Sequence, residues 1–168
     1  MIAVYIGLGT NWGNRLQNIR RAVEKLREVM IVEKISSLYL TQPVEIKGGW
    51  FVNCVAMAKT EKQPLSVLKN LLQIEEEMGR IRGEKEKRTI DLDLLFYGEK
   101  IIQEKELIVP HPRAHQRRFV LVPMVEINPQ FRHPLFGKSM QQLLKELKDS
   151  FEVEKIGNYP GGKNTKSG

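Results

Sequence analysis

KRTIDLDLLFYG, residues 87–98, is the clearest strand pattern in this sequence and also its least expected one. Apolar residues suited to a core-facing strand occupy alternate positions, at Ile90, Leu92 and Leu94. Asp91 and Asp93 fill the positions between them, although aspartate is depleted in strands. Side chains alternate across a strand, so we expect the apolar residues to face the core and both carboxylates to share the opposite face.

The two aspartates are candidate metal ligands. Their Cα atoms would lie about 6.5–7 Å apart on one strand face, and two carboxylates at this spacing repel each other unless a cation lies between them. Mg²⁺ fits because it prefers oxygen ligands and often joins one or two carboxylates to substrate phosphates. The pattern leaves one alternative open. In it the strand face is simply polar and exposed, with an ion pair between an aspartate and Arg88.

Basic segments flank this strand on both sides. The segment RIRGEKEKR, residues 80–88, contains five basic and two acidic residues, and a second basic cluster runs from His111 to Arg118. Such runs are usually solvated surface charge. Beside an acidic strand, however, guanidinium groups could clamp phosphates through paired hydrogen bonds, and the candidates are Arg80, Arg82, Arg88 and Arg117.

Length and composition favour one domain without disulfides. The chain has 168 residues, a net charge of +7 and a single cysteine, Cys54, in an apolar run that predicts a buried thiol. The charge favours anionic partners without selecting one. No apolar run approaches the ~20 residues of a membrane span, and the N-terminal pattern predicts a strand rather than a signal peptide. We therefore expect a cytoplasmic protein that does not bind membranes.

The element pattern predicts an α+β fold with a mostly antiparallel sheet. Strands are expected near residues 1–8, 31–41, 51–60, 90–97 and 151–156, and the turn at residues 97–100 predicts a hairpin into residues 101–102. Helices are expected to begin at the Asn14 cap, at Pro64 with Gly79 as terminator, and over residues 119–126 and 139–148. Residues 1–157 would form one domain, and residues 158–168 a disordered tail.

Three further features carry weaker signals. GLGTNWG, residues 7–13, lacks the spacing of a dinucleotide or Walker loop, so Gly7 and Gly9 are interpreted as sites of backbone freedom. His111 and His115 have the spacing of a zinc pair on a helix, but prolines flank His111 and disfavour one. Asn53 interrupts an apolar strand, where a buried amide needs partners that a heteroaromatic ligand could supply.

Six segments occur in an order that resembles the 6-hydroxymethyl-7,8-dihydropterin pyrophosphokinase family of the folate pathway: YIGLGTNWGN, SSLYLTQPV, FVNCV, IEEEMGRIR, RTIDLDLLFYG and VPHPRAHQRRFVLVP. The resemblance covers about residues 1–134. It implies a ferredoxin-like α/β/α sandwich. It also implies transfer of a pyrophosphoryl group from ATP to the pterin hydroxymethyl group, with release of AMP, by a protein that we expect to be a monomer.

The resemblance also implies a set of site residues. Asp91 and Asp93 would hold two Mg²⁺ ions on the triphosphate. ATP would be bound by Glu75, Arg82, His111 and Arg117, with Arg80 and Arg88 acting on the phosphates. The pterin would stack between Phe51 and Phe119, while Asn53, Thr41 and the Val44 backbone would bind its polar edge.

Some positions depart from the family pattern. Residues 80–88 lack the tryptophan of some members and form a shortened segment, and Phe51 stands where tyrosine is common. Leu72 and Glu106 replace residues that can be polar and basic, so we expect altered ATP affinity and the same reaction.

A nucleic-acid-binding module is disfavoured because only 7% of residues are aromatic and the segment 80–88 has none. An inactive relative is disfavoured by the presence of Asp91, Asp93, His111 and Arg117.

Overall fold

The computed structural model describes residues 1–42, 49–79, 89–148 and 152–159. Its elements are β1 (Ile2–Thr10), α1 (Arg15–Val29), β2 (Ile31–Ile35), β3 (Leu38–Thr41), β4 (Phe51–Thr60), α2 (Pro64–Glu77), β5 (Asp91–Tyr97), β6 (Ile102–Gln103), β7 (Ile108–Val109), the 3₁₀ turn η1 (Ala114–Gln116), α3 (Arg118–Ile127), α4 (Met140–Glu146) and β8 (Val153–Gly157).

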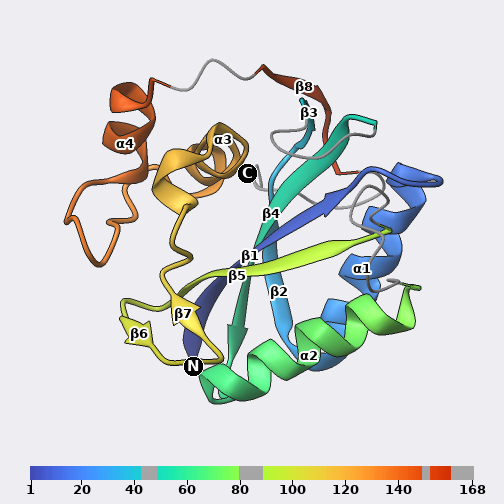
Figure 1. Ribbon diagram of the computed structural model, residues 1–168, viewed down its shortest axis with the longest axis horizontal. Coiled ribbons are helices and arrows are strands. Elements are labelled where there is room, and N and C mark those ends of the chain that lie inside the picture. Colours follow the sequence, from blue (N-terminus) through green and yellow to red (C-terminus); the bar gives the residue numbers. More distant parts are fainter. Residues whose placement is uncertain (43–48, 80–88, 149–151, 160–168) are drawn as a thin grey trace.

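A six-stranded sheet forms the middle layer of the fold. Its order is β5-β1-β4-β3-β8, with β2 pairing with the far end of β4, and every pairing between described strands is antiparallel. Helices α1 and α2 lie on one side of this sheet, and α3 and α4 lie on the other (Figure 1). The predicted α/β/α sandwich with an antiparallel sheet is therefore confirmed.

Two apolar clusters hold the three layers together. The first joins α1 and α2 to alternate sheet residues such as Leu8, Cys54 and Leu92. The second joins α3 and α4 to the opposite sheet face through Tyr5, Val55, Met57, Leu95 and Phe96. Burial, aided by the negative charge of Glu126, raises the pKa of the Cys54 thiol to about 12, which agrees with a buried cysteine that is not reactive.

The strand predicted over residues 31–41 is two strands in the structure. Ser36 and Ser37 separate β2 from β3, and the α3 residue Glu126 stabilises this break. Its carboxylate accepts hydrogen bonds from the Ser37 backbone N–H at 2.9 Å, the Ser37 hydroxyl at 2.7 Å and the Tyr39 hydroxyl at 2.7 Å. A residue 89 positions away thus fixes where β3 begins.

The predicted hairpin after the aspartate strand is wrong. β5 pairs with β1, whereas β6 pairs with β7 in a separate two-stranded sheet. The turn is present, with Lys100 N–H donating to the Tyr97 carbonyl, but Gly98 adopts a φ of +54° and leads the chain away from the sheet. Among the described residues, the outer edge of β5 is met by the Glu75 side chain and by the His111 backbone and pairs with no strand of the main sheet.

Most other predicted boundaries agree with the structure. Asn14 caps α1, and Gly79 follows α2 with a φ of +87°. The helix predicted over residues 139–148 is shorter, with Ser139 as its cap, and β8 is the predicted edge strand. No helix among the described residues is long and apolar enough to cross a membrane. Tyr159 is buried against the first cluster, and residues 160–168 of the predicted tail lie outside the described residues.

Candidate functional site

The predicted site residues of three strands share one face of the sheet. In the strand register Asp91 opposes Gly9, and Gly9 in turn opposes Asn53 on β4. Directly paired residues point to the same side of a sheet, and this is the side of Val55 and Leu95, which α3 covers. Asp93 lies two residues along β5 on the same face, as the alternation of the sequence predicted.

Phe51 and Thr41 continue this row of predicted site residues, on the same sheet face, from β4 to β3. They oppose each other in the register, and Phe51 is two residues from Asn53. The Thr41 hydroxyl donates a 2.5 Å hydrogen bond to Oδ1 of Asn53, and Asn53 is only 8% exposed. Because Oδ1 is held in this way, the amide orientation is fixed and its Nδ2 group is directed over Gly9.

Gly9 makes room for this arrangement. A Cβ atom at position 9 would lie 2.7 Å from Asn53 Nδ2 and 3.5 Å from a Phe51 ring carbon. Neither Gly7 nor Gly9 adopts a positive φ. The interpretation of these glycines as sites of backbone freedom is therefore wrong, because Gly9 serves close approach and not an unusual backbone conformation.

The resemblance implies that Asn53 binds the pterin, so we expect Gly9→Ala to weaken that binding. The new methyl group would collide with the Asn53 amide and displace it, raising KM for the pterin by about 10-fold, a cost of about 1.4 kcal/mol, with KM for ATP unchanged. Gly7→Ala is the matched control, because the three atoms nearest to its Cβ would be Leu95 side-chain carbons at ordinary contact distances of 3.5–3.7 Å. Steady-state kinetics would refute this account if the two variants behaved alike.

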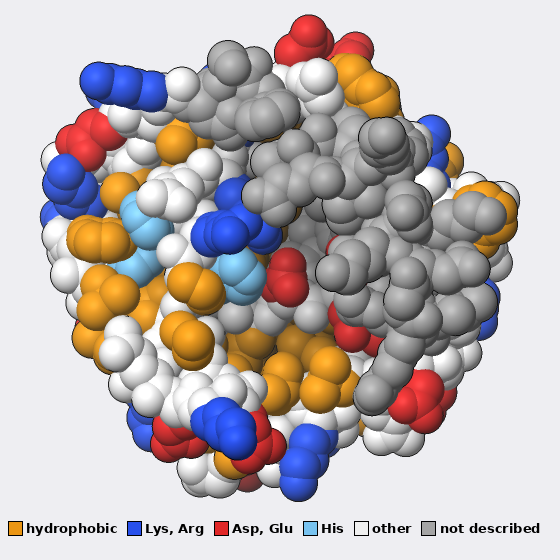
Figure 2. Space-filling model, in the orientation of Figure 1, with side chains coloured by type: hydrophobic (Ala, Val, Ile, Leu, Met, Phe, Trp, Pro, Cys, Tyr) orange, Lys and Arg blue, Asp and Glu red, His pale blue; other side chains and the backbone are white. Residues whose placement is uncertain are grey.

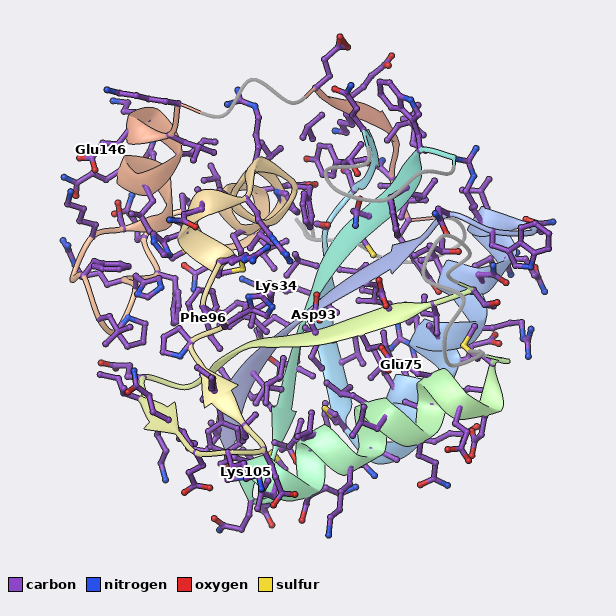
Figure 3. The ribbon with its side chains drawn as sticks, in the orientation of Figure 1. Lys34, Glu75, Asp93, Phe96, Lys105 and Glu146 are labelled. Carbon is purple, nitrogen blue, oxygen red and sulfur yellow. The ribbon has the colours of Figure 1, made fainter. Side chains whose placement is uncertain are left out.

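The acidic strand is held at its outer edge by Glu75. Oε2 of this α2 residue, which is 5% exposed, accepts a 2.7 Å hydrogen bond from the backbone N–H of Leu92, between the two aspartates. Figure 3 shows Glu75 between α2 and β5, and Asp93 on the side of β5 that faces α3. The local pattern does not predict this contact; its one signal is a glutamate in line with the apolar helix positions Leu71 and Met78.

His111 meets β5 at the same edge, farther along the strand. Its backbone N–H donates to the Leu95 carbonyl at 2.9 Å, and its Nδ1 accepts from the Arg113 N–H at 3.1 Å. Burial, followed by the positive charges of Arg117 and Arg113, lowers the pKa of His111 from 6.5 to about 4. The ring is therefore neutral at pH 7, and it can form hydrogen bonds but carries no charge.

Arg117 and Phe119 lie together where α3 begins. The Arg117 guanidinium is 5.3 Å from the centroid of the Phe119 ring, within the range of a cation–π contact. Phe51 and Phe119 are both partly buried. Figure 2 shows acidic, histidine and basic side chains adjacent to one another near the centre of this face of the molecule. The structure thus gathers both signs of charge that a metal and phosphate site needs.

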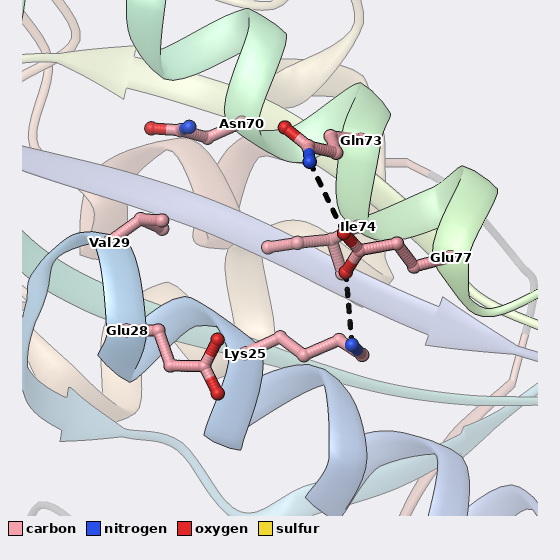
Figure 4. Close-up of a pocket in the computed structure, with 7 residues that line it drawn as sticks. All are labelled: Lys25, Glu28, Val29, Asn70, Gln73, Ile74 and Glu77. Carbon is pink, nitrogen blue, oxygen red and sulfur yellow. Dashed lines mark hydrogen bonds and ion pairs between the residues drawn. The ribbon is translucent and has the colours of Figure 1, made fainter.

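Four predicted residues lie outside the described residues: Val44, Arg80, Arg82 and Arg88. His115 points to a different neighbourhood from His111 and packs against His133 and Phe136. A surface groove between α1 and α2, lined by Lys25, Glu28, Val29, Asn70, Gln73, Ile74 and Glu77, contains none of the predicted residues (Figure 4). It lies on the opposite side of the sheet from the aspartates.

Stability is expected to fall as pH falls from about 6.5 to about 4. The folded-state pKa of His111 is about 4 and its unperturbed pKa is 6.5. Between these values the unfolded chain binds a proton that the folded chain does not, so acidification favours unfolding. Urea denaturation from pH 7 to 4.5 would measure this, and a His111→Gln variant should show a weaker pH dependence. An unchanged dependence would contradict the assignment.

Comparison with known proteins identifies the family. The model of the 7,8-dihydro-6-hydroxymethylpterin-pyrophosphokinase family matches residues 5–129, which include the aspartate strand, Asn53, His111 and Arg117. The chain belongs to this family.

Curated relatives of the pyrophosphokinase family agree. A protein of Aquifex aeolicus named 2-amino-4-hydroxy-6-hydroxymethyldihydropteridine pyrophosphokinase is 38% identical over 148 residues, covering 87% of this chain and 92% of that protein. The protein of the same name from Haemophilus influenzae is 36% identical over 163 residues, covering 93% and 97%. The folic acid synthesis protein fol1 of Pneumocystis carinii is 42% identical, covering 88% of this chain, which spans only 20% of that longer protein.

Solved structures of pyrophosphokinase fusions share the fold. A crystal structure of Plasmodium falciparum HPPK-DHPS with pteroate superposes with a TM-score of 0.71 at 16% sequence identity. The superposition covers 86% of this chain and 44% of that one. At this identity the likeness establishes the architecture, and the function rests on the family and on the geometry of the site.

Proposed function

We propose that this protein transfers pyrophosphate from ATP to 6-hydroxymethyl-7,8-dihydropterin, giving AMP and the pterin pyrophosphate, in folate biosynthesis. The observation that carries the proposal is the row of polar side chains on one sheet face, with the acidic pair at one end and a fixed amide at the other. The acidic pair lies on β5 and the amide on β4, with only β1 between them, which supports a cation-binding group and a heterocycle-binding group side by side in a chain of the pyrophosphokinase family.

The amide end would bind the pterin. Asn53 offers its Nδ2 donor and, through Oδ1, an acceptor that Thr41 holds in place. A pterin ring carries donors and acceptors along one edge, so a fixed primary amide can bind it with defined orientation. Phe51 and Phe119 would supply the stacking surfaces, and the Val44 backbone the remaining polar contact.

The acidic end fits magnesium. Asp91 and Asp93 supply two hard oxygen donors from one strand face, and no group of three or more metal-binding side chains occurs among the described residues. A site with two carboxylates and room for phosphate oxygens and water matches the preference of Mg²⁺. We propose two ions there, which would neutralise charge on the triphosphate when bound.

ATP would lie between the acidic strand and the segment that carries His111 and Arg117. Neutral His111 would form a hydrogen bond to the nucleotide or its phosphates, whereas Arg117 would contribute charge. Glu75 would contribute by fixing β5 as well as by contact with ATP. Arg80, Arg82 and Arg88 would clamp the phosphates.

The reaction needs positioning more than a strong base. The nucleophile is the pterin hydroxyl, which attacks the β-phosphorus as AMP departs. In phosphoryl-type transfer the protein mainly aligns the attacking oxygen and stabilises charge on the phosphates. Asn53 and the two aromatic rings would orient the hydroxymethyl group toward the triphosphate, and the arginines would hold the leaving and transferred groups.

Product analysis tests this function. Anion-exchange chromatography should show AMP release that requires both Mg²⁺ and 6-hydroxymethyl-7,8-dihydropterin. The matched control is 6-methyl-7,8-dihydropterin, which lacks the hydroxyl nucleophile and should yield no AMP. AMP release without any pterin would instead indicate hydrolysis of ATP, and it would contradict the proposal.

We further propose that residues 1–157 act as one catalytic domain, as a monomer in the cytoplasm. The single buried cysteine supports a chain that needs no disulfide. Light scattering coupled to gel filtration would measure the mass in solution, and a stable dimer would contradict the monomer.

A further inference from the structure

Two histidines outside the acidic site contact each other on the α3 side of the sheet. The ring centroids of His115 and His133 are 5.7 Å apart, with the planes at 77°. Nδ1 of His115 and Nε2 of His133 are both buried, and neither has a hydrogen-bond partner among the described residues. Buried polar atoms in folded proteins are nearly always paired, so this coincidence at one ring contact calls for an explanation.

His133 is held rigidly in its loop. Its backbone N–H donates to the Lys138 carbonyl at 2.9 Å, and its carbonyl accepts from Gly137 at 2.8 Å. Its Nδ1 accepts a 3.1 Å hydrogen bond from the Leu135 N–H, so Nδ1 carries no proton. Burial and the neighbouring His115 lower the pKa of His133 to about 4, so at pH 7 the neutral ring keeps its proton on Nε2. His133, which is 1% exposed, is therefore a fixed donor.

His115 lies in the segment that leads to the ATP site. It is the middle residue of η1, between His111 and Arg117. The Phe136 ring packs on both imidazoles, with centroids 4.7 Å from His115 and 4.6 Å from His133. His133 also meets the β5 residue Phe96 edge to face, with the ring centroids 5.5 Å apart. The histidine pair thus bridges the acidic strand and the segment 111–117.

We propose that His133 Nε2–H donates a hydrogen bond to His115 Nδ1, and that this bond is a positioning device for His111 and Arg117. The structure itself does not form this bond, and a rotation of the His115 ring, whose centroid is 5.7 Å from that of His133, would bring the two nitrogens together. The bond satisfies both orphaned nitrogens and requires His115 to carry its own proton on Nε2. Two imidazoles alone are too few ligands for a structural zinc site, so a neutral hydrogen-bonded pair accounts for the contact better than a metal. The role toward ATP rests on the function proposed above, whereas the hydrogen bond does not.

Long-range ¹H–¹⁵N NMR of the histidine-labelled protein at pH 7 tests the hydrogen bond. Both rings should be neutral and protonated at Nε2. The ¹⁵N chemical shift of the unprotonated Nδ1 of His115 should show that this atom accepts a hydrogen bond. A proton on Nδ1 of His115 would overturn the proposal. The measurement needs no turnover, so it decides the bond even if the chain proves to have no pyrophosphokinase activity.

Kinetics of matched variants test the positioning role. His115→Phe keeps a flat ring and removes the acceptor, so KM for ATP should rise about 10-fold while KM for the pterin and kcat change less than about two-fold. His115→Asn places an oxygen near the Nδ1 position and should restore most of the affinity. In a double-mutant cycle with His133→Phe the two losses should not add. Additive losses, or no rescue by His115→Asn, would overturn the role.

Discussion

Replacing Asp93 by asparagine should lower kcat about 10³-fold without unfolding the protein. The side chain is partly exposed on the sheet face and belongs to neither apolar cluster, and asparagine has the same shape. The change removes a negative charge that would hold Mg²⁺ against the triphosphate, and losing one such electrostatic contact typically costs 10²–10³-fold in rate. Steady-state AMP release at saturating ATP and pterin measures the effect.

Glu99→Gln is the matched control for the acidic pair. Glu99 follows β5 in an exposed turn, so removing its charge should leave kcat within about two-fold of the unchanged protein. Thermal unfolding of both variants should stay within a few degrees of the parent protein. An Asp93→Asn enzyme with near-parental kcat would contradict the assignment of the acidic pair to metal binding.

The second large effect is expected at the amide end. Asn53→Ala should lower kcat/KM for the pterin about 100-fold and leave KM for ATP unchanged. When a site binds a substrate through a fixed donor and acceptor, removing them lowers kcat/KM strongly, because polar groups of the substrate then remain unpaired. Steady-state kinetics with each substrate varied separately would measure the split.

Thr41→Val serves as the intermediate case. It keeps Asn53 but removes the hydroxyl that holds Oδ1, so the amide can rotate and the loss should be about 10-fold. The order of effects, with Asn53→Ala larger than Thr41→Val and both confined to the pterin, is the expected signature. An equal fall in kcat/KM for ATP and for the pterin would indicate a general disturbance of the sheet instead.

The aspartate strand shows how far local pattern reaches. The two-residue period alone placed Asp91 and Asp93 on the face opposite Leu92 and Leu94, and the structure agrees because alternation is a property of any strand. The row that joins Asp91 to Asn53 could not be derived in this way. It depends on the register of β5, β1 and β4, which is set by pairing across the sheet.

Other errors have the same tertiary origin. The break between β2 and β3 depends on Glu126 of α3. Residues 31–41 contain no local pattern that predicts a contact with a residue so distant in the sequence. The hairpin prediction failed because Gly98 turns the chain off the sheet. The roles of all the site residues stay predictions, and the 80–88 arginines and Val44 also lie outside the described residues.

The most direct test of the central claim is ³¹P NMR of the complete reaction with ATP, Mg²⁺ and 6-hydroxymethyl-7,8-dihydropterin. Attack at the β-phosphorus predicts AMP together with a pterin product that shows two coupled phosphorus signals, the signature of a diphosphate. ADP together with a pterin product that shows a single phosphorus signal would mean attack at the γ-phosphorus, and it would contradict the proposed alignment of the triphosphate over the acidic strand.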